Sequence, residues 1–420
     1  MNTKNAKLLS LMALAAMAVA TFSSDANATA QFARRYNVSC NLCHTAFPRL
    51  NSFGEKFAMN GYQMPGTSGE DTQTKISDNL SLGDIGKMAS LRISIIPFST
   101  KKGGLTVAGH SKDQTAIGRG QWFQFFTAGS IAKNISIFIE TEFENDKLHN
   151  NWLYMGFHNL AGPEGALNFR VGNLCAFDWH SVSGRLRANP PLKYSIMGSF
   201  KSAKGGSGNE DQLGIASANP GAEVFGYSGN FLYSGVVQSG KQVTASGPDT
   251  NQFQNYTGTL GYMVNDGDFE GSKLTLSVMS AVDTSSSSYK QRKDNLYVFY
   301  PGVTIRYKGL DLQGAFLYAK EDNYKLAAAK NKAITRGVGA GAGYYIKDNV
   351  YGHLQYDWLA SKDARNLGKY ITEHYVSPSV WFFPRANIRM GLTGKYDMDA
   401  KNANHKFKKH EVFSTIRAMF

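Results

Sequence analysis

Three observations predict a mainly β fold, an antiparallel barrel of about 16 strands that spans a membrane. Beyond residue 88 apolar and polar side chains alternate with a period of two, as Ile135, Ile137 and Ile139 do. Seven short turns alternate with eight longer polar loops along this stretch, and no helical period of 3.6 is sustained. The chain also carries 43 glycines, 26 phenylalanines and 21 tyrosines but only 11 prolines, which favours a barrel over a helical or α/β fold.

The turns and loops define the strand ends. The short turns fall at residues 132–134, 162–165, 228–230, 265–267, 308–309, 347–349 and 384–386. The longer loops fall at about 99–120, 146–150, 174–220, 239–251, 285–293, 321–333, 361–369 and 399–407. Strands of roughly ten residues result, with both ends of the barrel sequence on the short-turn side. Bacterial outer-membrane barrels have this even strand number, with short periplasmic turns and long external loops.

The last predicted strand ends on Phe420, which resembles the C-terminal signal that the barrel-assembly machinery reads in outer-membrane proteins. Alternation divides this strand into two faces, one with Val412, Ser414, Ile416, Ala418 and Phe420 and the other with Phe413, Thr415, Arg417 and Met419. Aromatic residues also stand near strand ends, as in an interfacial girdle: Tyr297, Phe299, Tyr307, Trp358, Tyr370 and Trp381. We therefore expect the chain in the outer membrane of a Gram-negative bacterium.

Residues 1–28 have the features of a secretory signal peptide. Lys4 and Lys7 precede an apolar run over residues 8–20, and Ala26-Asn27-Ala28 forms a cleavage site. The apolar run is too short for a stable membrane helix. The net charge of +13 comes from scattered basic residues, so we interpret it as contact with anionic lipopolysaccharide and bound anionic groups rather than nucleic acid.

A short motif near the predicted mature N-terminus carries the chemistry. Cys40-Asn41-Leu42-Cys43-His44 is a C-x-x-C-H, typical of covalent attachment of haem c. The two thiols add to the haem vinyl groups, and the histidine ligates the iron. One helical turn places all three side chains against one face of the macrocycle. The alternatives are a redox C-x-x-C and half of a zinc site, which needs two further ligands although the next candidate, His110, lies far along the chain. Cys175 has no partner left, so no disulfide framework is expected.

Several residues are candidates for the remaining contacts with the haem. A methionine thioether as the distal iron ligand raises the haem potential. Met64 is the first choice, because its loop can swing over the haem face, and Met59, on the expected helix, is the second. The histidines that rival them are His110, His149 and His180. Arg34 and Arg35 are candidates to pair with the haem propionates. The expected aromatic wall consists of Phe32, Phe47, Phe53 and Tyr62.

Four parts follow in order: the signal peptide at 1–28, a monohaem cytochrome c segment at 29–66, a linker at 67–87 and the barrel at 88–420. Fewer than 40 residues cannot bury a haem and a core of their own, so the helical segment is expected to dock on or in the barrel. Inside the barrel we expect Glu140, Glu142 and Glu144 to face arginines such as Arg389 and Arg417. Asp178 and His180 are candidates for binding metal or substrate from a long external loop.

This order of parts resembles the monohaem outer-membrane cytochrome–porin fusions, a family that includes iron-oxidising outer-membrane c-type cytochromes. The resemblance is carried by Phe32-Ala33-Arg34, by the motif from Cys40 to His44, and by Pro48-x-Leu50 and Phe53-Gly54, whereas the barrel matches in architecture only. It implies one covalent haem c and electron transfer across the outer membrane, from extracellular Fe(II) or another donor to a periplasmic c-type cytochrome or other soluble carrier. Thr29-Ala30-Gln31 stands where the iron oxidases have a proline, which leaves the donor open.

The sequence leaves two further functions open. One is an electron conduit or redox sensor with another extracellular donor or acceptor, including outward flow of electrons. The other is a transport porin whose haem is structural.

Overall fold

The computed structural model describes most of the chain outside the signal peptide. The described residues are 31–45, 49–66, 73–77, 80–83, 88–107, 110–144, 147–184, 192–200, 214–216, 218–239, 254–284, 293–324, 332–362, 370–385, 387–398 and 410–419. The predicted signal peptide, Phe47 and Phe420 lie outside these residues.

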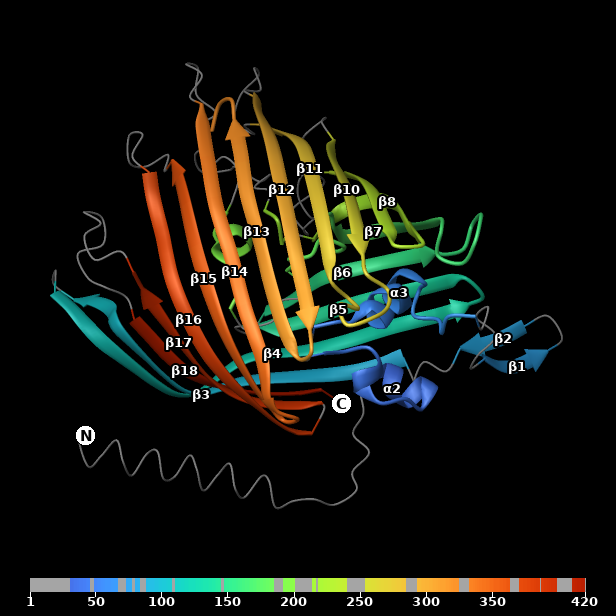
Figure 1. The fold of residues 1–420 in the computed structure, drawn as a ribbon, viewed down its shortest axis with the longest axis horizontal. Coiled ribbons are helices and arrows are strands. Elements are labelled where there is room, and N and C mark those ends of the chain that lie inside the picture. The colour runs from blue at the N-terminus through green and yellow to red at the C-terminus, as the bar shows by residue number, and fades with distance from the viewer. Residues whose placement is uncertain are drawn as a thin grey trace.

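Sixteen antiparallel strands, β3 to β18, form a closed barrel (Figure 1). They are β3 (Ala89–Val107), β4 (His110–Ala132), β5 (Ile135–Glu144), β6 (Lys147–Phe157), β7 (Asn168–Cys175), β8 (Ala218–Ser228), β9 (Phe231–Gln238), β10 (Asn255–Met263), β11 (Lys273–Thr284), β12 (Lys293–Tyr307), β13 (Leu310–Glu321), β14 (Ala333–Lys347), β15 (Val350–Lys362), β16 (Tyr370–Arg385), β17 (Ile388–Asp397) and β18 (His410–Met419). Each strand pairs with its neighbours in sequence, and β18 closes the ring on β3. The predicted fold class and strand number are confirmed.

All seven predicted short turns separate consecutive strands, from β4–β5 to β16–β17, and they lie at one end of the barrel. Two of the eight predicted loops are wrong. Residues 99–120 continue β3 and β4 as a long hairpin, and most of 146–150 belongs to β6. The long hairpin carries polar residues on both faces, and the described side chains at 113–120 are almost all exposed. Alternation therefore disappears from the sequence there, although the ladder continues through pairs such as Thr100 with Thr115.

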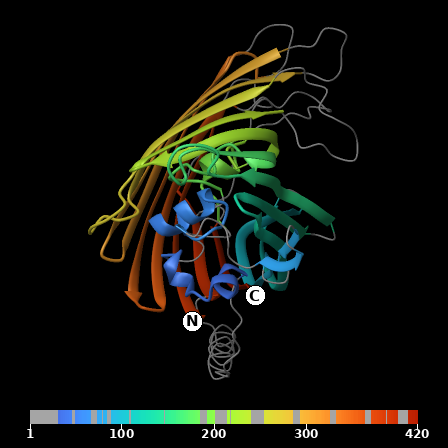
Figure 2. The same ribbon diagram turned by 90° about the vertical axis from the view of Figure 1, so that its right-hand side faces the viewer.

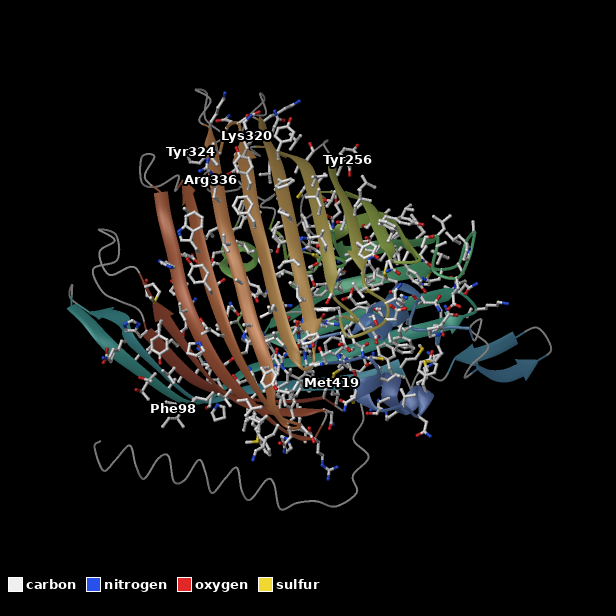
Figure 3. The ribbon with its side chains drawn as sticks, viewed as in Figure 1. Phe98, Tyr256, Lys320, Tyr324, Arg336 and Met419 are labelled. Atoms are coloured by element: carbon white, nitrogen blue, oxygen red, sulfur yellow. The ribbon has the colours of Figure 1, made fainter. Side chains whose placement is uncertain are left out.

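The outward face of the barrel is apolar. Large hydrophobic side chains are exposed on it around the ring, including Leu91, Ile93, Ile95, Phe123, Phe125, Leu153, Met155, Leu260, Leu276, Phe299, Leu354 and Leu392 (Figure 3). A closed barrel with such a surface is stable only in a lipid bilayer, and sixteen strands of this kind are typical of the bacterial outer membrane. None of the described helices is long and apolar enough to cross a membrane.

The inward face is polar and charged. Buried side chains there include Arg170, Glu223, Lys273 and Arg389. Trp381 also faces inward, fully buried, with the Arg389 guanidinium 4.3 Å from its ring centre. Its assignment to an interfacial girdle was wrong, because the register of β16 turns it to the lumen. Tyr297, Phe299 and Tyr307 are exposed on the outer face, as expected.

The described parts of the N-terminal segment, residues 31–45 and 49–66, lie inside the short-turn end of the barrel (Figure 2). It contains α2 (Gln31–Tyr36), a single 3-10 turn η1 (Cys40–Leu42) and α3 (Ser52–Met59). Asn51 caps α3 by accepting a hydrogen bond from the Gly54 N–H at 2.8 Å. The helix ends at Asn60, where Gly61 and Tyr62 take positive φ angles of 68° and 61°. Phe57 and Tyr62 share a core cluster with Phe126, Phe138 and Tyr154 of the barrel's inner wall.

The predicted linker at 67–87 is not wholly irregular. It contains β1 (Gln73–Ser77) and β2 (Leu80–Gly83), which pair with each other as a separate two-stranded sheet. The polar composition of this stretch concealed the pairing.

The described parts of the chain between β7 and β8 lie in the lumen rather than outside the barrel. Its described parts, residues 176–184, 192–200 and 214–216, are named here the lumen loop and include the single-turn helix α5 (Ser195–Gly198). Phe177, Val182, Tyr194, Ile196 and Phe200 are buried in the same core cluster as the N-terminal segment. Two pieces of chain therefore fill the described part of the lumen.

Candidate functional site

The C-x-x-C-H motif forms a tight turn that is held by hydrogen bonds within the turn and by hydrogen bonds from Asn51. The His44 and Cys43 N–H groups donate to the Cys40 carbonyl at 3.0 and 3.2 Å, so both cysteines and the histidine lie on one turn. The Asn51 N–H donates to the Cys43 carbonyl at 2.9 Å, and its side chain donates to the Leu42 carbonyl at 2.9 Å. Gly54 allows this close approach, because a Cβ at that position would lie 2.3 Å from the Cys43 carbonyl oxygen.

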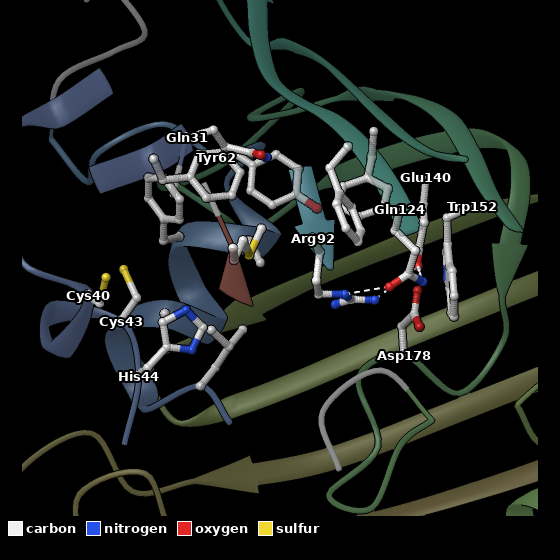
Figure 4. A pocket seen from close by; sticks show the side chains of 18 of the residues that line it. Gln31, Cys40, Cys43, His44, Tyr62, Arg92, Gln124, Glu140, Trp152 and Asp178 are labelled. Carbon is white, nitrogen blue, oxygen red and sulfur yellow. Dashed lines mark hydrogen bonds and ion pairs between the residues drawn. The ribbon is translucent and has the colours of Figure 1, made fainter. Parts of the chain in front are cut away.

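Cys40, Cys43 and His44 line a cavity of about 560 Å³ between the N-terminal segment and the barrel (Figure 4). This volume lies in the range of cofactor sites in proteins. The segment contributes the motif, Gln31, Phe32, Ala33, Val38, Ser39, Leu50, Gly54, Phe57, Ala58 and Tyr62. The barrel and the lumen loop contribute Arg92, Trp122, Gln124, Phe126, Phe138, Glu140, Glu142, Asn151, Trp152, Asp178, Trp179, Gly184, Lys193, Ala216, Ala218, Asn387, Arg417 and Met419.

The residues present fit a covalently bound haem. Neither Cys40 nor Cys43 forms a disulfide, and Figure 4 shows the His44 ring beside both thiols in the cavity. Burial raises the pKa of Cys43 to about 11 and also raises the pKa of Cys40, so both sulfurs are uncharged thiols at neutral pH. A thiol, a thiol and an imidazole on one turn, facing a largely aromatic cavity, form the donor set that haem c requires.

The barrel wall opposite the motif carries a charged network. Arg92 donates from Nε to Gln124 at 2.5 Å, and Gln124 donates to Glu140 at 2.8 Å. Arg92 also pairs directly with Glu140 at 3.4 Å. Glu140 and Glu142 line the interior as predicted, whereas the Glu144 side chain lies outside the described residues.

Arg417, one of the two arginines predicted to face these glutamates, lines the same cavity as Glu140 and Glu142. Arg92 on β3 pairs with Glu140, whereas Arg417 donates to Ser94 at 2.8 Å and Arg389 packs over Trp381. The sequence could not reveal which arginine reaches Glu140, because that depends on the pairing of β3 with β4 and of β4 with β5.

Arg34 and Arg35, the predicted propionate partners, hold the segment to the barrel. Arg34 donates to the Ala89 carbonyl at 2.5 Å, and Arg35 donates to the Ser130 hydroxyl at 2.8 Å. Neither lines the cavity, where the described cationic side chains are Arg92, Arg417 and Lys193.

The predicted distal ligands lie apart from the cavity lining. Met59 is buried in a second apolar cluster with Trp179, Phe225, Leu232 and Met263. Met64 is half-buried against the main core cluster, and it is not among the lining residues. The ligand prediction itself stays a prediction.

The rival histidines divide into two groups. The side chains of His110 and His149 lie outside the described residues. His180 is fully buried in the lumen loop, where Nε2 donates to the Tyr300 carbonyl at 2.9 Å and Nδ1 accepts from the Val182 N–H at 3.1 Å. Burial lowers the pKa of His180 to about 3, so it is a neutral structural histidine.

The aromatic wall is partly as predicted. Phe32 and Tyr62 line the cavity and stack on each other with ring centres 4.9 Å apart. The Tyr62 hydroxyl is hydrogen-bonded to the Tyr154 hydroxyl at 3.0 Å. Phe53 stacks behind on Phe57 at 6.3 Å and does not line the cavity. The wall is completed by aromatic side chains that the sequence did not single out: Trp122, Phe126, Phe138 and Trp152 of the barrel and Trp179 of the lumen loop.

Asp178 and His180 do not form an external binding site, contrary to expectation. Asp178 is buried, lines the cavity and pairs with Arg170 at 3.0 Å. The loop that bears both residues folds inward because its apolar side chains join the core. Among the described residues, no group of three or more histidine, cysteine, aspartate or glutamate side chains is arranged to hold a metal ion.

Buried ion pairs anchor the N-terminal segment at the short-turn end. Lys273 of β11 pairs with Glu55 at 2.5 Å and also donates to the Trp179 carbonyl at 3.1 Å. Arg49 pairs with Asp311 of β13 and donates to Thr304 at 3.0 Å. These strand positions lie beside the short turns, so the motif sits at the periplasmic end of an outer-membrane barrel.

Comparison with known proteins identifies the fold. The described architecture resembles the Salmonella typhi OmpF–daunomycin complex, with a TM-score of 0.55, 11% identity and coverage of 79% of this chain and 97% of that chain. It is also similar to the anion-selective porin of Comamonas acidovorans, with a TM-score of 0.54, 11% identity and coverage of 79% and 99%. The fold is that of a porin. It is similar as well to the DcaP outer-membrane channel of Acinetobacter baumannii, with a TM-score of 0.53, 12% identity and coverage of 79% of this chain and 97% of that chain.

At such low identity these porins share a fold with the chain and nothing finer. No family model and no curated protein sequence matches the chain. Together with the apolar outer face, the fold makes the chain a porin-like barrel of the Gram-negative outer membrane.

Proposed function

We propose that the chain is an outer-membrane c-type cytochrome that carries electrons between the cell exterior and the periplasm. One observation carries the proposal: a complete C-x-x-C-H motif faces a cavity inside the lumen of a closed outer-membrane barrel. A small soluble cytochrome has no need of a barrel, and a transport pore is not helped by a large obstruction.

The chain's own residues have defined roles in this proposal. Cys40 and Cys43 would hold the haem through thioether bonds to its vinyl groups, and His44 would supply a nitrogen ligand to its iron. Arg92 and Arg417 are the arginines placed to neutralise its carboxylates, a role that the sequence suggested for Arg34 and Arg35. Phe32, the cavity tryptophans and Tyr62 exclude water. When bound, haem c supplies a one-electron ferric/ferrous couple.

The placement of the segment supports electron exchange with the periplasm. Asn41 and Leu42, between the two cysteines, are exposed at the short-turn end, so the edge of the motif is open to a soluble carrier there. A periplasmic c-type cytochrome is the partner we propose. Toward the long-loop end the lumen loop fills the described lumen, which keeps large molecules from the cavity.

Fe(II) is the donor that we propose first, on the resemblance of the motif region to iron-oxidising cytochromes. Each Fe(II) would give up one electron and leave as Fe(III). The alternative among electron-transfer functions is a conduit or redox sensor with another extracellular donor or acceptor. It stays open because the described residues contain no cluster of side chains arranged to bind iron.

A transport porin with a structural haem is the second candidate function. The similarity to porins and outer-membrane channels favours it, because these are the proteins that share the fold. The packed N-terminal segment and lumen loop argue for a sealed barrel instead.

One preparation of the protein tests all three candidate functions. The full chain is produced in a Gram-negative host with its cytochrome c maturation system, purified from outer membranes and stained for haem after denaturation. Covalent haem that is reduced on stopped-flow mixing with Fe(II) supports the proposal. A protein without covalent haem overturns it, and haem that is reduced only by other donors overturns the iron assignment. Solute-permeable liposomes containing the protein would favour the transport function.

A further inference from the structure

We propose that Met419, at the end of β18, is the second axial ligand of the haem iron. This inference rests on the proposed function, because it requires a haem attached at Cys40 and Cys43. Cytochromes c that transfer electrons commonly carry a methionine opposite the histidine, and this thioether raises the reduction potential. The question is which side chain of the cavity can take that position.

Few described lining residues can ligate haem iron. Besides His44 they are Met419, Tyr62, Lys193 and three carboxylates. The carboxylates have partners of their own, since Glu140 pairs with Arg92, Asp178 pairs with Arg170 and Glu142 accepts a hydrogen bond from Asn151. Tyr62 is held by the hydrogen bond of its hydroxyl to the Tyr154 hydroxyl and by stacking on Phe32. Lys193 has no acceptor lone pair until its ammonium loses a proton. Met419 needs no proton loss to act as a ligand.

The other two candidate methionines are placed elsewhere. The Met59 side chain is 1% exposed and packs behind the lining residue Trp179, together with Phe225, and it does not itself line the cavity. Met64 packs against the core cluster beyond Tyr62 and does not line the cavity. Of the described methionines, only Met419 is both inside the barrel and in the cavity wall.

The register of β18 turns Met419 inward. Phe413, Thr415 and Arg417 face the lumen, and Met419 is the next residue on that face. It stands opposite Arg92 of β3, which lines the same cavity. Figure 3 shows Met419 at the short-turn end of the barrel, close to α2.

The backbone of Met419 is fixed, while its side chain keeps room to move. The Met419 N–H donates to the Asn387 carbonyl at 3.0 Å, and the Asn387 side chain donates back to the Met419 carbonyl at 2.8 Å. The side chain is half-buried against the core cluster, and its three rotatable bonds let the sulfur adjust to a planar macrocycle. A fixed strand end with a flexible thioether suits an axial ligand.

The assignment couples the haem to closure of the barrel. His44 belongs to the N-terminal segment and Met419 to the last strand, which closes the ring by pairing with β3. Both ligands therefore come together only after the segment has docked in a closed barrel. A correctly ligated haem would be a spectroscopic sign of complete assembly.

The test compares matched leucine variants of the purified full-length protein in the ferric state. Met419→Leu should abolish the far-red charge-transfer band of a methionine–iron bond and lower the midpoint potential, while covalent haem staining is unchanged. Met64→Leu and Met59→Leu should keep the band. Met419→His should give a low-spin spectrum without the band, because imidazole replaces the thioether.

Two controls separate this inference from the proposed function and from misfolding. Variants are compared only if they show the heat-modifiable gel migration of a folded barrel, since Met419 adjoins the terminal Phe420. A band that persists in Met419→Leu and Met419→His, or that is lost in Met64→Leu, overturns the inference while the haem remains bound. A wild-type protein with no covalent haem overturns the proposed function itself, before any methionine variant is compared.

Discussion

The N-terminal segment and the lumen loop both pack inside the barrel, but different interactions hold them. The segment is anchored by buried ion pairs, Lys273 with Glu55 and Arg49 with Asp311. In the lumen loop, Asp178 pairs with Arg170 of β7, the strand that leads into the loop, at 3.0 Å. Beyond β7 the loop packs Ile196 into the core and donates the Ser195 N–H to Asp357 at 2.7 Å.

The difference follows from how each piece is attached. The lumen loop is tethered at both ends, by β7 and β8, so little entropy remains to be lost when it docks. The segment joins the barrel through residues 67–87 and must find its own position. Buried charge pairs are costly unless every partner is in place, so they favour one docked position over others. We expect the segment to be the more sensitive to single substitutions of charge.

The largest effect is expected from the motif itself. The double variant Cys40→Ala, Cys43→Ala should lose all covalent haem, because no other described thiol faces the cavity. Haem staining of the denatured protein measures this. Cys175→Ala is the matched control, since Cys175 is buried on β7 and hydrogen-bonded to the Ile215 carbonyl at 3.2 Å. Equal staining of the motif variant and the control would contradict the attachment.

The next largest effect concerns the ion pair of α3. Glu55→Gln leaves the Lys273 ammonium buried without its carboxylate, which should weaken docking of the segment by about 3 to 5 kcal/mol. Hydrogen exchange of residues 52–59 reports the change. Asp322→Asn is the control, because its pair with Lys320 is partly exposed at 3.8 Å and should contribute less than about 1 kcal/mol. Similar exchange in both variants would show that the buried pair of Glu55 with Lys273 does not hold the segment in place.

A pH effect of intermediate size is expected at His158, in the turn after β6. Its Nδ1 donates to the Met59 carbonyl at 3.1 Å and its Nε2 accepts from the Ser136 hydroxyl at 2.8 Å. Burial lowers the pKa of His158 to about 4, from an ordinary value of 6.5.

The sign of this effect follows from the lowered pKa. Between pH 6.5 and about 4 the undocked state binds the proton and the docked state does not. Docking should therefore be strongest above pH 6.5 and should weaken as the pH falls to 4, by up to about 3 kcal/mol. Exchange at residues 56–62, followed against pH, measures it. His158→Gln should flatten that pH dependence, and an unchanged slope would show that another group is responsible.

The smallest effect is expected in the lumen loop. Tyr300→Phe removes the hydrogen bond from the Tyr300 hydroxyl to the Val182 carbonyl, 2.9 Å long, and should weaken the loop by about 1 kcal/mol. Exchange of residues 177–183 should rise while that of residues 52–59 stays the same. A parallel rise in both would mean that the two pieces form one cooperative unit.

The sequence by itself determined the barrel and the motif. Period-two alternation, turn spacing and strand length predicted sixteen strands and all seven short turns, because a barrel wall exposes each residue to either lipid or lumen. Alternation failed where both faces meet water, in the hairpin of β3 and β4, and it also missed the start of β6 and the two short strands β1 and β2. The turn of the motif was readable as well, since Cys40, Cys43 and His44 lie within one turn of chain.

Only the tertiary structure decided what faces the motif. Arg92, Trp179 and Met419 are 48 or more residues from the motif in sequence, and strand register and loop folding bring them to one cavity. The sequence favoured Met64 as a haem ligand and Arg34 as a propionate partner because both are near the motif. In the structure Met64 packs against the core cluster and Arg34 is hydrogen-bonded to the Ala89 carbonyl of the barrel wall. Residues that are close in sequence form the turn of the motif. The pairing of β18 with β3 forms the wall of the cavity opposite that turn.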